Sequence, residues 1–133
     1  MFTRKSNIHP ALLASDMAAT VPASELETLD RIATTITVPA GKQIVRKDGF
    51  GRECFIVIDG EFLVERDDAK IVVGPGSVIG ELALLTLQPR TASVTATTDA
   101  SVYVLTRAEF ATILDVCPNL AGFVHAGAAR RAA

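Results

Sequence analysis

Residues 80–93 read GELALLTLQPRTAS, and this stretch decides how the rest of the chain is interpreted. It opens with a glycine and an acidic residue, continues with one turn of apolar helix formers, and ends with Pro89, Arg90 and small residues. The first turn of a helix leaves backbone amides without intrahelical partners, and such amides can cradle an anion. An arginine binds the same kind of group through a charge-assisted fork. The stretch is therefore suited to holding a phosphate.

The same residues also have a plainer interpretation. A glutamate and an arginine nine positions apart, as Glu81 and Arg90 are, most often form a surface ion pair worth under about 1 kcal/mol. The run Leu-Ala-Leu-Leu by itself is ordinary core. The surrounding sequence favours the phosphate site, because the stretch is embedded in a regular series of short strands.

Short β-favouring runs separated by turn residues extend from residue 36 to residue 106 on both sides of this stretch. Such spacing is typical of an antiparallel sandwich or barrel. Asp59-Gly60 stands between the runs 54–58 and 61–65, where it predicts a tight hairpin. Asp67-Asp68 turns the chain back into 70–73. We expect eight or so short strands in a β jelly roll, with strands at 93–97 and 101–105 after the central stretch.

Helices are expected on both flanks, over residues 1–35 and 107–133, and the 133 residues suffice for a single domain with one core. Ser24 with Glu27 is a capping-box pattern that predicts a helix over 24–34. Pro10 can begin a shorter helix before it. Thr106 with Glu109 is a second capping box, followed by a stop near 117–119 and a last helix from about residue 120.

Residues 80–92 resemble the phosphate-binding cassette of the cyclic nucleotide-binding domain family. This family occurs in cyclic-nucleotide-dependent kinase regulatory subunits, gated ion channels and catabolite-activator-type regulators. The resemblance rests on GELALL, a short loop and PRTA, and more widely on residues 36–105, including the turns at 59–60 and 74–76. It implies a mainly β jelly roll with flanking helices that binds cAMP or cGMP.

The resemblance also implies roles for single residues. Glu81 would accept a hydrogen bond from the ribose 2′-hydroxyl, and Arg90 would hold the cyclic phosphate. Backbone amides of Leu82, Ala83 and Ala92 would lie near the same phosphate, and the two alanines leave space beside the sugar.

Gly80 would let the backbone approach the ligand closely. Thr91 stands directly after the arginine, where the family associates a hydroxyl with tolerance of cGMP. The breadth of the family favours cAMP, so both nucleotides remain candidates.

Two features depart from the family's pattern. Only about a dozen residues, 120–132, are expected in the final helix, roughly 18 Å at the standard rise, so we do not expect a full lid over the base. Residues 50–54, FGREC, also stand where the family usually has a more acidic, glycine-rich loop.

Catalytic motifs are absent from the sequence, so we expect no enzyme and no cofactor. It contains no Gly-x-Ser-x-Gly elbow, His-Glu-x-x-His run or Walker-type motif. A jelly roll is also compatible with a metal-dependent, cupin-like enzyme. No histidine lies between residues 36 and 105, so the β region lacks the usual metal ligand of such an enzyme. His9 and His125 are expected on helix surfaces.

Charge and hydropathy limit the partners and the location. The formal net charge is −2 and the basic residues are scattered, so direct nucleic-acid binding is not expected. Residues 71–87 are apolar but broken by glycines and Glu81, which argues against a membrane span. No signal-peptide pattern is visible, so we expect a cytoplasmic protein in which Cys54 and Cys117 are buried reduced thiols.

The sequence thus predicts a cyclic-nucleotide sensor whose C-terminal helices shift position when ligand binds, and which acts on a protein effector or as a homodimer. The alternative is a scaffold of the same fold that binds no ligand and serves dimerisation or protein docking.

Overall fold

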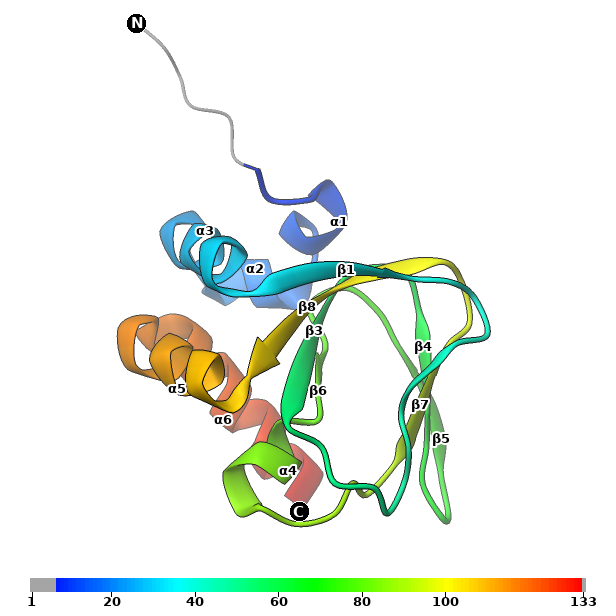
Figure 1. Ribbon diagram of the computed structural model, residues 1–133. Helices are drawn as coiled ribbons and strands as arrows, with labels where there is room; N and C mark the ends of the chain where they lie inside the picture. The colour runs from blue at the N-terminus through cyan, green and yellow to red at the C-terminus, as the bar shows by residue number, and fades with distance from the viewer. Residues whose placement is uncertain (1–6, 133) are drawn as a thin grey trace, which may run out of the picture.

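The computed structural model describes residues 7–132 as helices flanking a set of short strands (Figure 1). The helices are α1 (Pro10–Leu13), α2 (Asp16–Thr20), α3 (Ala23–Ile32), α4 (Glu81–Thr86), α5 (Arg107–Val116) and α6 (Pro118–Ala132). The strands are β1 (Thr34–Val38), β2 (Gln43–Val45), β3 (Glu53–Asp59), β4 (Phe62–Glu65), β5 (Lys70–Val73), β6 (Val78–Ile79), β7 (Ser93–Ala96) and β8 (Ala100–Thr106).

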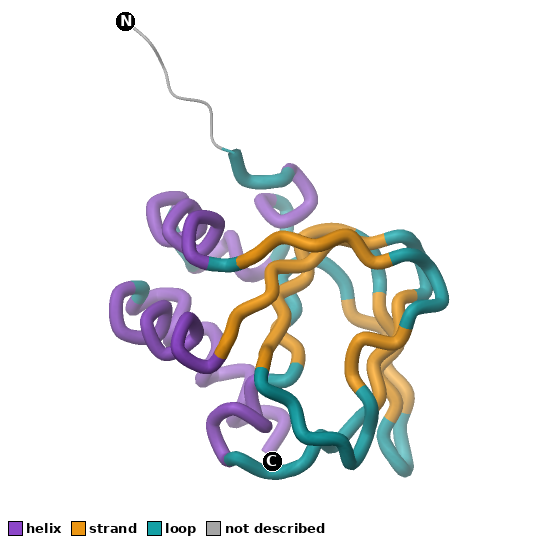
Figure 2. Tube along the Cα trace, viewed as in Figure 1, coloured by secondary structure: helices purple, strands orange, loops and turns teal. Residues whose placement is uncertain are grey.

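The strands form two four-stranded antiparallel sheets that face each other (Figures 1 and 2). One sheet has the order β1-β8-β3-β6 and the other has the order β2-β7-β4-β5. Side chains from both sheets fill the space between them, among them Val57, Phe62, Val94 and Val102. The predicted jelly roll with flanking helices is therefore confirmed.

The helices cover the outer face of the first sheet (Figure 2). Successive side chains of a strand point to opposite faces, and β3 uses both. Phe55 and Val57 belong to the core between the sheets, while Cys54 and Ile56 belong to a second core shared with the helices. This arrangement explains why β3 is a continuous apolar run rather than an alternating one.

The predicted hairpin at Asp59-Gly60 is wrong. β3 pairs with β6 and β8, whereas β4 pairs with β5 and β7, so the chain changes sheets at this turn. Gly60 has φ +92, and a Cβ there would lie 2.6 Å from the Cβ of Ala100. The glycine therefore permits a close crossing of the β7–β8 turn, which a local turn signal does not distinguish from a hairpin. The hairpin predicted at 67–68 does form, between β4 and β5.

The capping box predicted at Ser24 is also wrong. Helix α3 begins at Ala23 with Pro22 as its N-cap, and no side chain caps it. Ser24 lies inside the first turn, where its carbonyl accepts a hydrogen bond from the Thr28 hydroxyl. The short helix at Pro10 is confirmed, and His9 caps it by accepting a hydrogen bond from the Ala11 amide.

Helix α2 and strand β6 were not predicted. The helix has five residues and the strand has two, and both are too short to give a periodic signal in the sequence. The last helix begins at Pro118, slightly earlier than predicted. Cys54 and Cys117 are buried free thiols, as expected. Within residues 7–132, no helix has the length and apolar character needed to cross a bilayer.

The second capping box is confirmed and yields a stability prediction. The Thr106 hydroxyl accepts from the Glu109 amide, and the Glu109 carboxylate accepts from the Thr106 amide. Thr106→Ala removes the first of these bonds and should lower the free energy of unfolding by about 1 kcal/mol. Urea denaturation measures this loss. Thr112→Ala on the exposed side of the same helix is the control, and an equal loss in both variants would contradict the cap.

Candidate functional site

Helix α4 begins where β6 ends, and a glycine makes the connection. Gly80 is the N-cap residue of α4 and has φ +84, a left-handed conformation that favours glycine. Leu87 ends the helix, also with a positive φ of 59. The turn of apolar helix formers that follows Gly80 and Glu81 in the sequence is helical as expected, with helix bounds at Glu81 and Thr86.

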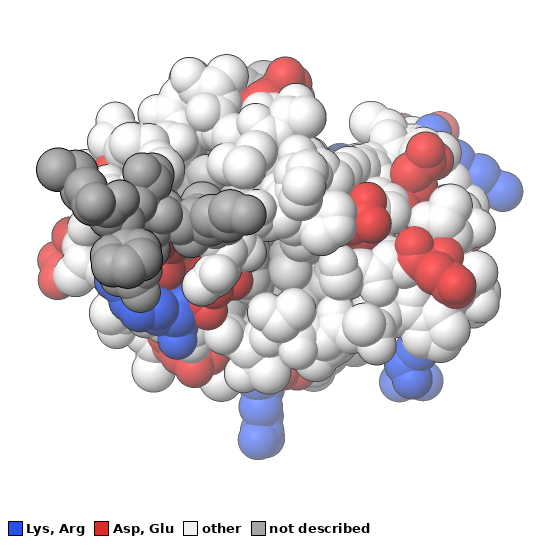
Figure 3. Space-filling model, turned by 90° about the horizontal axis from the view of Figure 1, so that it is seen from above, with Lys and Arg blue, Asp and Glu red and all other residues white. Residues whose placement is uncertain are grey.

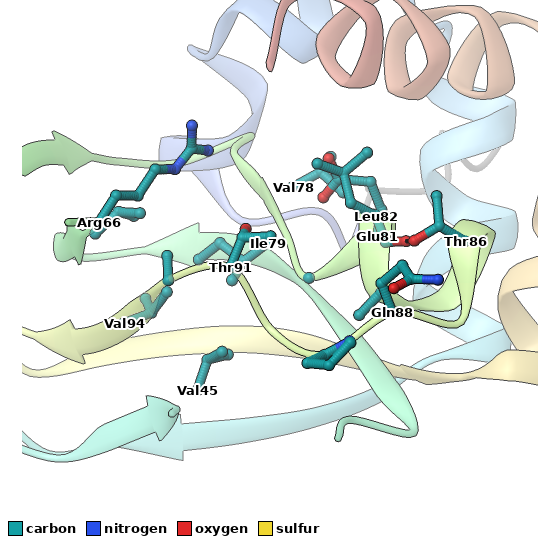
Figure 4. Close-up of a pocket in the computed structure, with 15 residues that line it drawn as sticks. Val45, Arg66, Val78, Ile79, Glu81, Leu82, Thr86, Gln88, Thr91 and Val94 are labelled. Carbon is teal, nitrogen blue, oxygen red and sulfur yellow. Dashed lines mark hydrogen bonds between the residues drawn. The ribbon is translucent and has the colours of Figure 1, made fainter. Parts of the chain in front are cut away.

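A cleft of about 550 Å³, including its part open to solvent, lies between α4 and the second sheet (Figure 4). Six of the seven predicted site residues line it: Gly80, Glu81, Leu82, Ala83, Thr91 and Ala92. The opposite wall comes from the second sheet, through Val45, Val64, Arg66 and Val94. Most of the lining is apolar, with a few polar groups among it, which is the usual composition of a small-molecule site.

Glu81 is buried, with 1% of its surface exposed. It lies in the first turn of α4, near the positive end of the helix dipole, where a carboxylate is stabilised. Figure 4 places it beside Leu82 at the helical wall of the cleft. Thr91 is exposed and lies between this wall and Arg66.

Arg90 is the seventh predicted residue, and it does not line the cleft directly. Its Nη1 donates to the Gly80 carbonyl at 3.0 Å, and its Nη2 donates to the Glu53 carbonyl at 2.6 Å. Gly80 is part of the cleft wall, so the guanidinium stands immediately behind that wall. Two of the five N–H donors of the group are used by these carbonyls.

Two glycines make room for the Arg90 side chain. A Cβ on Gly51 would lie 1.8 Å from Nη2 of Arg90, and a Cβ on Gly80 would lie 2.2 Å from Nη1. The predicted reason for Gly80 was a close approach of ligand to backbone. The structure gives a different one, because the arginine itself occupies the space where a side chain would be.

Arg90 forms no ion pair with a carboxylate among residues 7–132. The side chain is only 8% exposed, and none of the ion pairs among the described residues includes it. Burial lowers the pKa of Arg90, and the neighbouring Cys54 and Glu53 act in the opposite direction. A buried charge without a counterion is costly. The site therefore holds a cation that an anionic ligand would stabilise.

Sequence reasoning missed the second sheet's share of the site. Val45, Val64 and Arg66 come from strands or turns that are distant from residues 80–92 in the sequence. Only the packing of β2 and β4 against β7 brings them to the cleft. The sequence did offer one signal: Phe62, Val64 and Arg66 are spaced two residues apart, so they lie on the same face of a strand.

Charged residues are scattered over the face of the molecule that Figure 3 shows. On that face the lysines and arginines stand apart from one another, with acidic residues between them. Within residues 7–132, no group of three or more His, Cys, Asp or Glu side chains is placed to hold a metal ion. His125 is exposed on α6, as expected.

Comparison with known proteins gives a consistent result. A family model described as "Cyclic nucleotide-binding domain" matches residues 35–116. A cyclic nucleotide-gated potassium channel of Rhizobium etli is 33% identical over 94 residues, which cover 71% of this chain and 26% of the channel. A cGMP-dependent protein kinase of Caenorhabditis briggsae is 32% identical over 107 residues, 80% of this chain and 14% of the kinase. The chain thus matches only a minor part of these relatives.

Among solved structures, the catabolite activator protein of Thermus thermophilus superposes with a TM-score of 0.76. The superposition covers 88% of this chain and 58% of that protein, at 24% sequence identity. At this identity the match shows a shared fold and nothing more.

Proposed function

Because the chain belongs to the cyclic nucleotide-binding domain family, we propose that it is a receptor that binds a cyclic nucleotide in the cleft between α4 and the second sheet. The observation that carries this proposal is the buried Arg90 guanidinium, which has no carboxylate partner among the described residues. A cyclic phosphodiester carries one negative charge and can supply that partner.

In the proposed complex, the phosphate and ribose of the ligand lie at α4 and the base points toward the second sheet. Arg90 binds the phosphate with N–H groups that the carbonyls of Gly80 and Glu53 leave available. Glu81 accepts a hydrogen bond from the ribose hydroxyl. Gly80, Leu82, Ala83 and Ala92 supply backbone and small or apolar surface around the sugar and phosphate. The base extends past Thr91 toward the second sheet.

Titration calorimetry with cAMP and cGMP, using 5′-AMP as the control, tests this proposal. A cyclic phosphodiester has one charge and no free terminal phosphate, so a site built for it should discriminate against 5′-AMP. We expect binding in the micromolar range or tighter to a cyclic form and none to 5′-AMP. Absence of heat and of competition at millimolar concentrations of both cyclic forms would contradict the proposal and favour the non-binding scaffold.

We further propose that binding changes the position of α5 and α6, as a regulatory domain requires. Helix α6 packs against α4, α2 and α5, so it contacts the element that forms the helical wall of the cleft. A ligand shifts such an equilibrium only if it interacts differently with the two helix positions. Hydrogen exchange should therefore change in α5 and α6 on ligand addition, and unchanged exchange in both helices would contradict the coupling.

A further inference from the structure

Arg66 faces the cleft from the side opposite α4. Along β4, the side chains of Phe62 and Val64 pack into the core between the sheets. Because side chains alternate between faces, Arg66 continues the same row at the end of the strand. It lines the cleft together with Val64. Figure 4 shows its guanidinium across the cleft from Glu81 and Leu82, with Thr91 between them.

The guanidinium of Arg66 forms no hydrogen bond or ion pair with the residues that the structure describes. Its Nε is buried and makes no hydrogen bond to any described residue. The adjacent carboxylates are already paired elsewhere, since Asp67 binds Lys47 and Glu65 lies 3.8 Å from Lys70. The Arg66 amide donates to the Ala69 carbonyl at 2.8 Å, which fixes the backbone at the turn into β5. A buried donor without an acceptor is unfavourable, so this side chain is suited to a ligand that brings acceptors.

We propose that Arg66 recognises the purine edge that carries N7 and O6, and that it makes the site prefer cGMP over cAMP. This inference rests on the proposed function, which places phosphate and ribose at α4 and so directs the base toward the second sheet. An arginine only donates hydrogen bonds. Guanine offers two acceptors on this edge, N7 and O6, whereas adenine offers one acceptor and the donor N6 amino group. The guanidinium fork therefore matches guanine and opposes the amino group of adenine.

Calorimetric titration of the whole chain with cGMP, cAMP and cyclic inosine monophosphate tests the proposal. Cyclic inosine monophosphate keeps N7 and O6 but lacks the 2-amino group, so it separates recognition by Arg66 from any contact to that amino group. In the unmodified protein we expect both O6-bearing nucleotides to bind roughly tenfold or more tightly than cAMP.

Arg66→Met retains the apolar stem and should remove that preference, weakening cGMP and cyclic inosine monophosphate about tenfold with little change for cAMP. Arg66→Lys keeps the charge but lacks the fork, so it should also lose most of the preference. Arg46→Met removes an equal charge from an exposed position after β2 and should leave all three affinities unchanged.

The outcomes separate the two proposals. Tighter binding of cAMP by the unmodified protein, or equal weakening of all three nucleotides in Arg66→Met, overturns the role of Arg66 and leaves the proposed function standing. Failure of the unmodified protein to bind any of the three overturns both.

Discussion

Replacing Arg90 with leucine is expected to weaken the binding of a cyclic nucleotide by about 2–4 kcal/mol, or roughly 30-fold to 1,000-fold in affinity. The guanidinium is buried and has no carboxylate partner among the described residues, so the ligand phosphate is its proposed counterion. Loss of a hydrogen bond between neutral groups would cost only about 1 kcal/mol. The size of the effect therefore reports the charge of the contact as well as its presence.

Calorimetry on Arg90→Leu and on Arg52→Leu makes this comparison. Arg52 is an exposed arginine that directly precedes β3 and does not line the cleft, so its removal changes the net charge equally. Thermal unfolding of both variants checks that the loss of the Gly80 and Glu53 contacts has not unfolded the protein. If a folded Arg90→Leu variant binds as tightly as Arg52→Leu, the phosphate contact is refuted.

The second large effect is expected at Glu25, which joins α3 to the start of α6. Its carboxylate accepts from the Leu120 amide at 2.9 Å and from the Asn119 side-chain amide at 2.6 Å. These donors lie in the first turn of α6, whose amides have no intrahelical acceptors. Glu25→Gln replaces one accepting oxygen with a donor and should lower the free energy of unfolding by about 2 kcal/mol at pH 7.

The same carboxylate gives this effect a pH dependence. Burial alone raises the pKa of Glu25, but the hydrogen bonds from Asn119 and Leu120 outweigh it and hold the pKa below its ordinary value of 4.5. A depressed pKa in the folded state means that the stabilisation is complete above pH 4.5 and is lost as the pH falls through the folded-state pKa.

Chemical denaturation at pH 7 and at about pH 3 therefore tests Glu25 directly. The stability difference between the unmodified protein and Glu25→Gln should be largest at pH 7 and should shrink at the acidic pH. Glu27→Gln, two residues along the same helix, controls for the change in net charge. A difference that is the same at both pH values would show that ionisation of Glu25 contributes nothing.

Local signals predicted the parts of this structure that local contacts determine. The Thr106 and Glu109 box joins residues three positions apart, and α4 with its flanking glycine lies within one continuous stretch. The predictions of a capping box at Ser24 and of a hairpin at Gly60 were wrong, because each sequence pattern is compatible with two local structures. In both places the packing of distant segments decided between them.

The candidate site likewise contains residues that local sequence predicts and contacts that depend on distant segments. Six of its predicted residues could be assigned to the site because they lie close together in one stretch of the sequence, and all six line the cleft. The contact of Arg90 with the Glu53 carbonyl spans 37 residues, and the bond of Glu25 to the Leu120 amide spans 95. Arg66 reaches the cleft only through the pairing of β4 with β7. No spacing rule along the chain anticipates the contacts of Arg90 and Glu25, and the alternation along β4 indicates which face Arg66 occupies but not which cleft it lines.

The pairing of β1 with β8 has a consequence for how fast the protein reaches its native state. Thr34 lies opposite Val104, and Val38 lies opposite Ala100, so these two neighbouring strands are separated by most of the barrel sequence. The entropy of closing such a long loop has to be overcome before the pairing contributes any stability. Proteins dominated by pairings of this kind fold in milliseconds to seconds rather than in microseconds. During that interval β3, which is apolar on both faces, lacks the strands and helices that cover it, so refolding at high protein concentration should favour aggregation.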